Sequence, residues 1–146
     1  TNDAPQTIAR LMNMGIAPYN ITSSVTLVIA QRLARRLCSK CKKPQELPEN
    51  ALLAEGFTAE QIKAGFTLYD AVGCDECTEG YKGRTGIYQV MPMSDDIQAI
   101  VLEGGNAMQI AAVAQKAGIR DLRQSALMKV RNGVTSLAEI NRVTKD

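Results

Sequence analysis

The sequence predicts an α+β fold: an antiparallel pair of strands flanked by helices, an insertion between the strands, and a helical bundle at the C-terminus. Two C-x-x-C pairs, Cys38/Cys41 and Cys74/Cys77, contain all the cysteines of the 146-residue chain. A strand-like stretch ends directly before Cys38, and a second one begins a few residues after Cys77. Short helical patterns separated by glycines fill residues 94–146. These three observations carry the fold prediction.

The composition is that of an ordinary globular protein. Hydrophobic residues make up 45% of the chain and charged residues 22%, and the formal net charge is only +2. With two Phe, four Tyr and no Trp, the core must be mostly aliphatic. No stretch approaches the roughly 18 consecutive apolar residues of a membrane span, and no signal peptide is visible. Four free-standing cysteines in a chain with neither feature suggest a reducing cytoplasm, and the chain has the character of a fragment of something larger.

Residues 1–37 are expected to contribute a helix and a strand to the core. Asp3 can cap a helix, and Gly15 is placed to end it in a left-handed conformation. Pro18 opens a short helical turn to about residue 23. Apolar residues alternate over residues 26–37, which favours a strand of unusual length. A helix through the same residues is the alternative, because Ala, Gln, Leu and Arg are good helix formers.

Residues 38–83 form the predicted insertion, and residues 84–93 the second core strand. Within the insertion, residues 48–55 can form a short helix that Gly56 stops. A capping box at Thr58 starts a further helix, and residues 66–72 alternate weakly as a short strand. Residues 79–84 have the composition of a turn, and the strand after it spans residues 85–91, ended by Pro92. An antiparallel pairing of the two core strands would bring the cysteine pairs together.

The remaining residues, 94–146, are predicted to form four helices in a compact bundle. Ser94 caps the first, Gly118 ends the second, and the third is stopped near Gly133. Ser136 and Glu139 make the capping-box pattern for the last helix. Short loops join these helices, which favours packing between neighbours.

The two cysteine pairs predict a closed metal site with Cys38, Cys41, Cys74 and Cys77 as ligands. Two C-x-x-C pairs can supply four thiolates to a tetrahedral zinc ion, and the chain has no histidine to take part. Four protein ligands leave no position for a reactive water, so we expect one structural zinc per chain. A redox dithiol and an iron–sulfur cluster are the lesser alternatives.

A run of basic residues surrounds the first cysteine pair: Arg32, Arg35, Arg36, Lys40, Lys42 and Lys43. These cations could offset the negative charge of a four-thiolate zinc site. Nucleic-acid binding is the alternative, but no aromatic residues interleave with the cations and the insertion that follows is acidic. We therefore expect no nucleic-acid partner. No nucleophile–base set is visible, so we assign no catalytic residue.

Several stretches resemble the secretion ATPase superfamily of type II and type IV systems. They are TNDAP (residues 1–5), NMGIAP (13–18), AQRLARRLC (30–38), GYKGRTGIYQV (80–90) and GVTSLAEI (133–140), together with the two cysteine pairs. Within that superfamily the chain is most similar to the type IV pilus assembly (extension) ATPases. The resemblance covers essentially the whole chain.

The resemblance implies the C-terminal part of a RecA-like ATPase domain, from a bacterial homohexamer that works at the inner membrane through a membrane platform protein. It implies zinc ligation by the four cysteines, and ATP and Mg²⁺ in the full-length protein only. The Walker motifs would lie outside these residues, so the fragment alone should be inactive. For Arg32, the resemblance suggests a phosphate-proximal or intersubunit position, with a salt bridge to the C-terminal helices as the equal alternative.

The resemblance leaves two functional alternatives open. A type II secretion or DNA-uptake ATPase carries similar motifs. A stand-alone zinc-binding adaptor module is the alternative from a different class.

Overall fold

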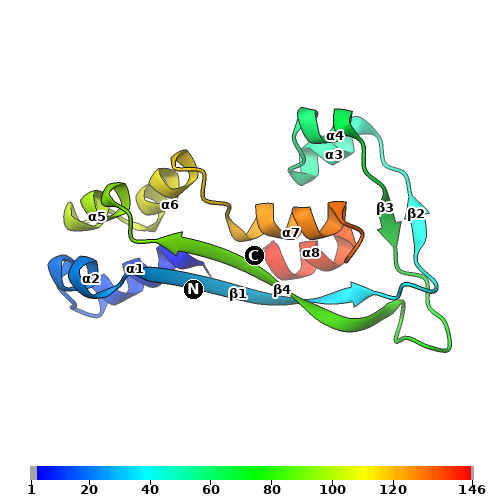
Figure 1. Ribbon diagram of the computed structural model, residues 1–146, viewed down its shortest axis with the longest axis horizontal. Helices are drawn as coiled ribbons and strands as arrows, with labels where there is room; N and C mark the ends of the chain where they lie inside the picture. The colour runs from blue at the N-terminus through cyan, green and yellow to red at the C-terminus, as the bar shows by residue number, and fades with distance from the viewer. Residues whose placement is uncertain (1–2, 146) are drawn as a thin grey trace. The chain divides into compact units, whose positions relative to one another are not determined.

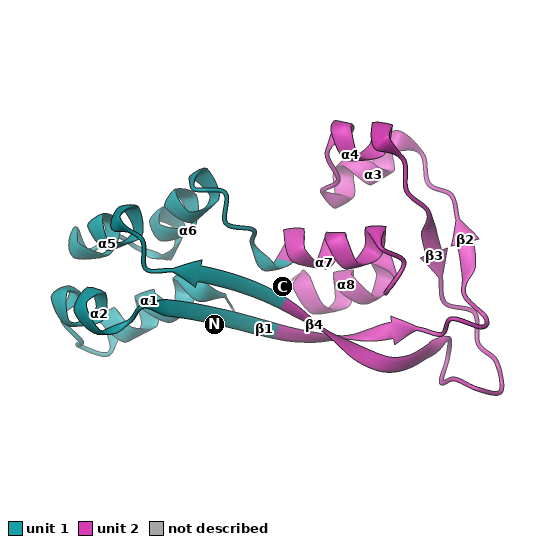
Figure 2. Ribbon diagram, viewed as in Figure 1, with its two compact units in different colours: residues 1–31, 88–122 teal, residues 32–87, 123–146 magenta. Residues whose placement is uncertain are grey.

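The computed structural model describes residues 3–145, and these divide into two compact units (Figure 2). Unit 1 comprises residues 1–31 and 88–122, and unit 2 comprises residues 32–87 and 123–146. Strands β1 (Leu27–Leu37) and β4 (Tyr81–Pro92) pair with each other in a two-stranded antiparallel sheet (Figure 1). Each of these strands contributes one half to unit 1 and the other half to unit 2.

Unit 1 is built from four helices and the strand halves they cover. The helices are α1 (Ala4–Asn13), α2 (Pro18–Ser24), α5 (Asp95–Leu102) and α6 (Ala107–Lys116). Their buried side chains form one aliphatic cluster with a residue of β4: Ala4, Ile8, Ile21, Met91, Ile97, Val101, Ile110 and Ala114. The absence of large aromatic side chains from this cluster agrees with the aliphatic core expected from the composition.

Local sequence explains where the unit 1 helices begin and end. The Asp3 carboxylate accepts a hydrogen bond from the Gln6 backbone N–H and caps α1. Gly15 follows this helix with φ +92°, in the left-handed conformation expected of it. Ser94 caps α5 as predicted. Asn106 and Gln109 form a reciprocal capping box at α6, which the sequence analysis had not identified.

Unit 2 contains the insertion and the last two helices. The insertion carries β2 (Lys43–Gln45), α3 (Glu49–Glu55), α4 (Ala59–Ala64) and β3 (Leu68–Asp70), and β2 pairs antiparallel with β3. Neither insertion helix contains a buried residue. The apolar interior of the insertion is small: Phe57 and Leu68 are buried, and the ring centroids of Phe57 and Phe66 lie 4.7 Å apart.

The last two helices, α7 (Leu122–Arg131) and α8 (Leu137–Thr144), complete the secondary structure. The expected single bundle over residues 94–146 is divided between the units. Helices α5 and α6 belong to unit 1, whereas α8 and all but the first residue of α7 belong to unit 2. The reason is that the apolar faces of α5 and α6 pack against α1 and α2, which the sequence pattern did not reveal.

Both core strands were predicted, and the structure corrects the start of the second. The stretch predicted over residues 26–37 is strand β1, Leu27–Leu37, rather than the alternative helix. Strand β4 begins at Tyr81, so residues 81–84 belong to a strand and the prediction of a turn there was wrong. The glycines at 83 and 86 had suggested a turn, but pairing with β1 extends the strand through them. Strand β2 was missed because Pro44 lies at its centre.

Within the described residues 3–145, no helix has the length and apolar character needed to cross a membrane.

Candidate metal centre

The four cysteines lie together in unit 2, as their spacing predicts. Their sulfur atoms all lie within 4.8 Å of one another. The Sγ atoms of Cys38 and Cys74 are 3.8 Å apart, those of Cys41 and Cys77 3.7 Å, and those of Cys74 and Cys77 3.5 Å. A tetrahedral ion with metal–sulfur bonds of about 2.3 Å places its sulfurs roughly 3.8 Å apart. These separations therefore fit one tetrahedral ion bound by all four thiolates.

The electrostatics of the cluster also favour a bound cation. The backbone N–H of Lys40 lowers the pKa of the Cys38 thiol to about 7, in spite of desolvation. The backbone N–H of Glu76 lowers the pKa of Cys74, but burial and the neighbouring Cys77, Cys38 and Cys41 outweigh it and raise that pKa. Four thiols at this separation cannot all ionise against their mutual repulsion. A divalent ion at the centre removes that repulsion.

Backbone geometry around the second cysteine pair orients the sulfurs. The Gly73 N–H points to the Cys41 sulfur at 3.3 Å, and the Cys74 N–H points to the Cys77 sulfur at 3.2 Å. Lys40 in the first C-x-x-C turn forms an ion pair with Glu76 in the second. The two turns therefore contact each other through protein groups as well as through the sulfurs.

Gly80 joins the second cysteine pair to β4 at a crowded position. Its carbonyl oxygen accepts a hydrogen bond from the Cys38 N–H at 2.9 Å, which ties the two cysteine-bearing segments together. The residue has φ +93°, and an added Cβ would lie 2.6 Å from the Ala71 Cβ and 2.8 Å from the Val72 nitrogen. Only glycine fits this position without a shift of the backbone.

Substitution of Gly80 by alanine is therefore expected to destabilise unit 2 by about 3 kcal/mol, from left-handed strain together with overpacking. Gly65→Ala is the matched control, because Gly65 also has positive φ (+85°) but nothing lies within 4 Å of its added Cβ. This control should cost less than Gly80→Ala, because it carries the strain of positive φ without the overpacking. Urea unfolding of both variants measures the difference, and equal losses would show that the close approach at Gly80 is unimportant.

The insertion is held against α7 and α8 by polar contacts. Arg123 of α7 donates from Nη2 to the Glu55 carboxylate at 2.7 Å and to the Glu55 carbonyl oxygen at 2.9 Å. Its Nη1 donates to Asn141 and Thr144 on α8. At the other end, the Lys42 ammonium donates to the Gly133 carbonyl at 3.0 Å. These contacts lie within unit 2 and fix the insertion at two points.

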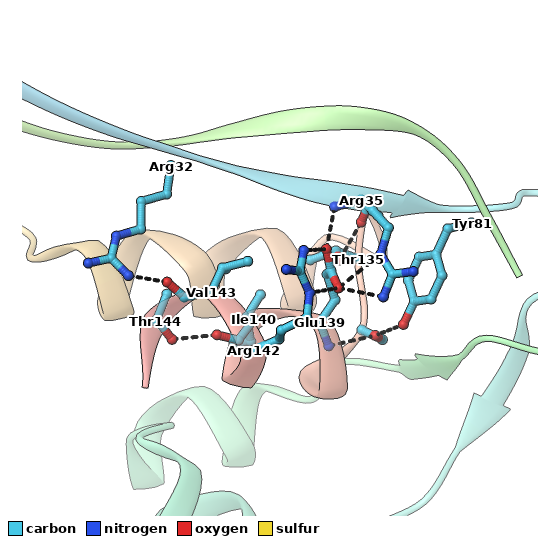
Figure 3. A network of polar contacts seen from close by, with 10 residues as sticks. Arg32, Arg35, Tyr81, Thr135, Glu139, Ile140, Arg142, Val143 and Thr144 are labelled. Carbon is cyan, nitrogen blue, oxygen red and sulfur yellow. Dashed lines mark hydrogen bonds and ion pairs between the residues drawn. The ribbon is translucent and has the colours of Figure 1, made fainter. Parts of the chain in front are cut away.

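Most cations of the basic run make such contacts within the chain. Lys42 also lies over a tyrosine ring, with its Nζ 4.2 Å from the ring centroid of Tyr69. Lys40 pairs with Glu76, as described above. Arg32 donates from Nη1 to the Val143 carbonyl near the C-terminal end of α8 (Figure 3), where a cation interacts favourably with the helix dipole. This contact is with α8, the region that the intramolecular alternative names, and both the salt bridge and the phosphate-proximal or intersubunit position of Arg32 stay predictions.

A buried carboxylate, Glu139, organises the contact between β1 and α8 (Figure 3). Its side chain is fully buried and forms ion pairs with Arg35 and Arg142. The carboxylate accepts hydrogen bonds from the Arg35 backbone N–H at 2.7 Å and from both guanidinium groups at 2.8–3.1 Å. Burial alone would raise the pKa of Glu139, but the hydrogen bonds from Arg142 and Arg35 outweigh it and lower the pKa to about 2.

Sequence reasoning identified Glu139 only as half of a capping box. Ser136 caps α8 as predicted, because its Oγ accepts a hydrogen bond from the Glu139 N–H at 3.1 Å. The Glu139 side chain does not complete the box and instead reaches the two arginines. The only sequence signal for this network was an acidic residue in the first turn of a helix and a cluster of arginines 104 residues earlier, with nothing to connect them.

Comparison with known proteins finds secretion and pilus assembly proteins that are similar to this chain over nearly its whole length. Residues 1–142 match the family described as "Type II/IV secretion system protein". The chain is 56% identical to the type IV pilus assembly ATPase PilB of Acinetobacter baylyi, over 100% of the chain and 25% of that relative. It is 53% identical to PilB of Pseudomonas aeruginosa, over 100% of the chain and 26% of the relative. The type II secretion system ATPase E of Vibrio cholerae is 41% identical, over 100% of the chain and 28% of the relative.

The chain thus spans about a quarter of the length of the curated relatives it matches.

Proposed function

The chain belongs to the type II/IV secretion system protein family, and on this premise we propose that it is a subdomain of a hexameric ATPase that powers type IV pilus assembly. The observation that carries the proposal is the identity of 53–56% to two pilus assembly ATPases along the whole chain. The type II secretion relative is less similar, at 41%. Type II secretion and DNA uptake are therefore the alternative functions.

In this proposal the four cysteines hold one structural zinc ion. The closed four-thiolate shell has no place for a substrate, so the metal supplies stability and not chemistry. Residues 38–80 then form the zinc-bearing insertion between β1 and β4, two strands of a RecA-like core. The contacts of Arg123 and Lys42 with their partners then hold the insertion as a rigid part of unit 2.

ATP and Mg²⁺ binding, assembly into a homohexamer and contact with an inner-membrane platform protein belong, in this proposal, to the full-length protein. The isolated chain is inactive because the nucleotide-binding motifs lie outside it. Arg32 retains a proposed place near a phosphate or a neighbouring subunit, alongside its contact with α8. No catalytic residue is assigned within these 146 residues.

The proposal is tested by exchanging this chain for the matching region of known ATPases. We expect a PilB of Acinetobacter baylyi carrying this chain to restore pili in a strain that lacks PilB. The same exchange into the Vibrio cholerae type II secretion ATPase is expected to support little secretion, since the identity there is lower. Piliation by electron microscopy and secretion of an exported enzyme are the two measurements.

Secretion without piliation, from chimeras that accumulate equally and hydrolyse ATP, would overturn the pilus assignment in favour of type II secretion. Chimeras that accumulate but hydrolyse no ATP would favour the stand-alone adaptor instead.

A further inference from the structure

Strand β1 ends directly before the first cysteine pair, and β4 begins shortly after the second. The buried carboxylate of Glu139 is connected to both strands. Arg35 lies on β1 three residues before Cys38, and Tyr81 begins β4 four residues after Cys77. The Arg35 guanidinium carbon lies 4.2 Å from the centroid of the Tyr81 ring. Glu139 holds that guanidinium through hydrogen bonds at 2.9 and 3.1 Å.

These contacts continue through Ser136 back to Glu139, so that they form a closed cycle at the N-terminal end of α8 (Figure 3). The Tyr81 hydroxyl and the Ser136 hydroxyl are 2.6 Å apart and share a hydrogen bond. Ser136 in turn accepts from the Glu139 N–H. Thr135 donates from its hydroxyl to the Arg35 carbonyl at 2.7 Å, so β1 is held on both its N–H and its carbonyl side.

The residues that make these contacts lie only a few positions from the cysteines along the chain. The Leu37 N–H donates to the Val134 carbonyl at 2.8 Å, and the next N–H, that of Cys38, donates to Gly80 at 2.9 Å. Arg35, Tyr81 and Cys77 also line one cavity of about 550 Å³. A movement of Arg35 or Tyr81 would therefore shift the cysteine sulfurs, because only a few residues of backbone separate them.

We propose that Glu139 is a positioning residue for the four-cysteine metal centre: through Arg35 and Tyr81 it fixes the ends of β1 and β4, and so the separation of the two thiolate pairs. The inference rests on the metal centre proposed above. A carboxylate is needed because it accepts several charge-assisted hydrogen bonds at once. An amide in its place turns an N–H₂ group toward the guanidinium donors and releases Arg35 from its position over Tyr81.

The test compares charge-removing substitutions in the intact protein loaded with zinc or with cobalt(II). Glu139→Gln is expected to bind zinc about tenfold more weakly than the unsubstituted protein, as loss of groups that orient metal ligands typically does, and so to transfer zinc to a chelator faster. It should also change the ligand-field absorption bands of the cobalt(II) form, which report the geometry of the four sulfurs. Glu60→Gln is the charge-removing control, since Glu60 is an exposed residue in the first turn of α4.

A second pair of variants keeps the test decisive if Glu139→Gln fails to fold. Arg35 and Arg142 both bond the Glu139 carboxylate, but only Arg35 lies on a strand that carries a cysteine. Arg35→Lys is therefore expected to accelerate zinc transfer and alter the cobalt(II) spectrum, whereas Arg142→Lys leaves both nearly unchanged.

Equal effects of Arg35→Lys and Arg142→Lys would overturn the positioning role. Zinc transfer in Glu139→Gln that is no faster than in Glu60→Gln would also overturn it. If the unsubstituted protein binds neither metal, the metal centre itself is refuted, and the inference fails with it.

Discussion

Replacement of Cys77 by serine is expected to unfold the insertion and to lower the stability of unit 2 more than any other substitution considered. A serine hydroxyl stays protonated at neutral pH and cannot replace a thiolate ligand. A structural zinc site can contribute on the order of 10 kcal/mol of apparent folding free energy. The insertion has little to replace that contribution, because its two helices bury no residue.

Hydrogen exchange over residues 38–83, together with thermal melting at fixed zinc concentration, measures this effect. Ser39→Ala is the control, because Ser39 is an exposed residue inside the first cysteine pair and contributes no thiol. We expect the control to melt with the unsubstituted protein. Unchanged exchange protection and melting in the Cys77 variant would mean that the fold does not depend on a metal.

The second large effect is expected at Glu139, where the stability of the protein should depend on pH. The pKa of Glu139 is lowered from 4.5 to about 2 in the folded protein, so the ionised carboxylate stabilises the fold at any pH above the unfolded value. That contribution, on the order of 3 kcal/mol, is lost as the pH falls from about 5 toward about 2. Glu139→Gln should remove it at neutral pH, because two arginines then lose a buried partner.

Urea unfolding of Glu139→Gln and of the unsubstituted protein across this pH range tests the prediction. The thiolates of the metal centre also protonate in acid, so the informative quantity is the difference in unfolding free energy between the two proteins. We expect that difference to be largest at neutral pH and to shrink as the pH falls. A difference that is constant with pH would contradict the proposed ionisation of Glu139.

Much of the secondary structure and the composition of the metal centre could be predicted from local signals. Helix starts at Asp3, Thr58, Ser94 and Ser136 follow from side chains that accept a nearby backbone N–H. The grouping of the four cysteines follows from the spacing within each pair and from strands beside each pair. Both kinds of signal depend on residues only a few positions apart.

Features that depend on contacts between distant residues could not be predicted. Glu139 and Arg35 are 104 residues apart, and each side chain alone is typical of a solvated helix or strand surface. The division of the last four helices between the two units depends on which apolar faces meet, and helical periodicity does not specify that. Strand β2 is set by its pairing with β3, against the local preference of Pro44.

The central claim is that four thiolates close a structural zinc site which holds the insertion in place. Native mass spectrometry of the protein, purified without chelator, tests it most directly. We predict one zinc ion per chain and no reactive thiol until a chelator is added. A chain that carries no metal, or a mass two or four protons lower that indicates disulfides among Cys38, Cys41, Cys74 and Cys77, would contradict it.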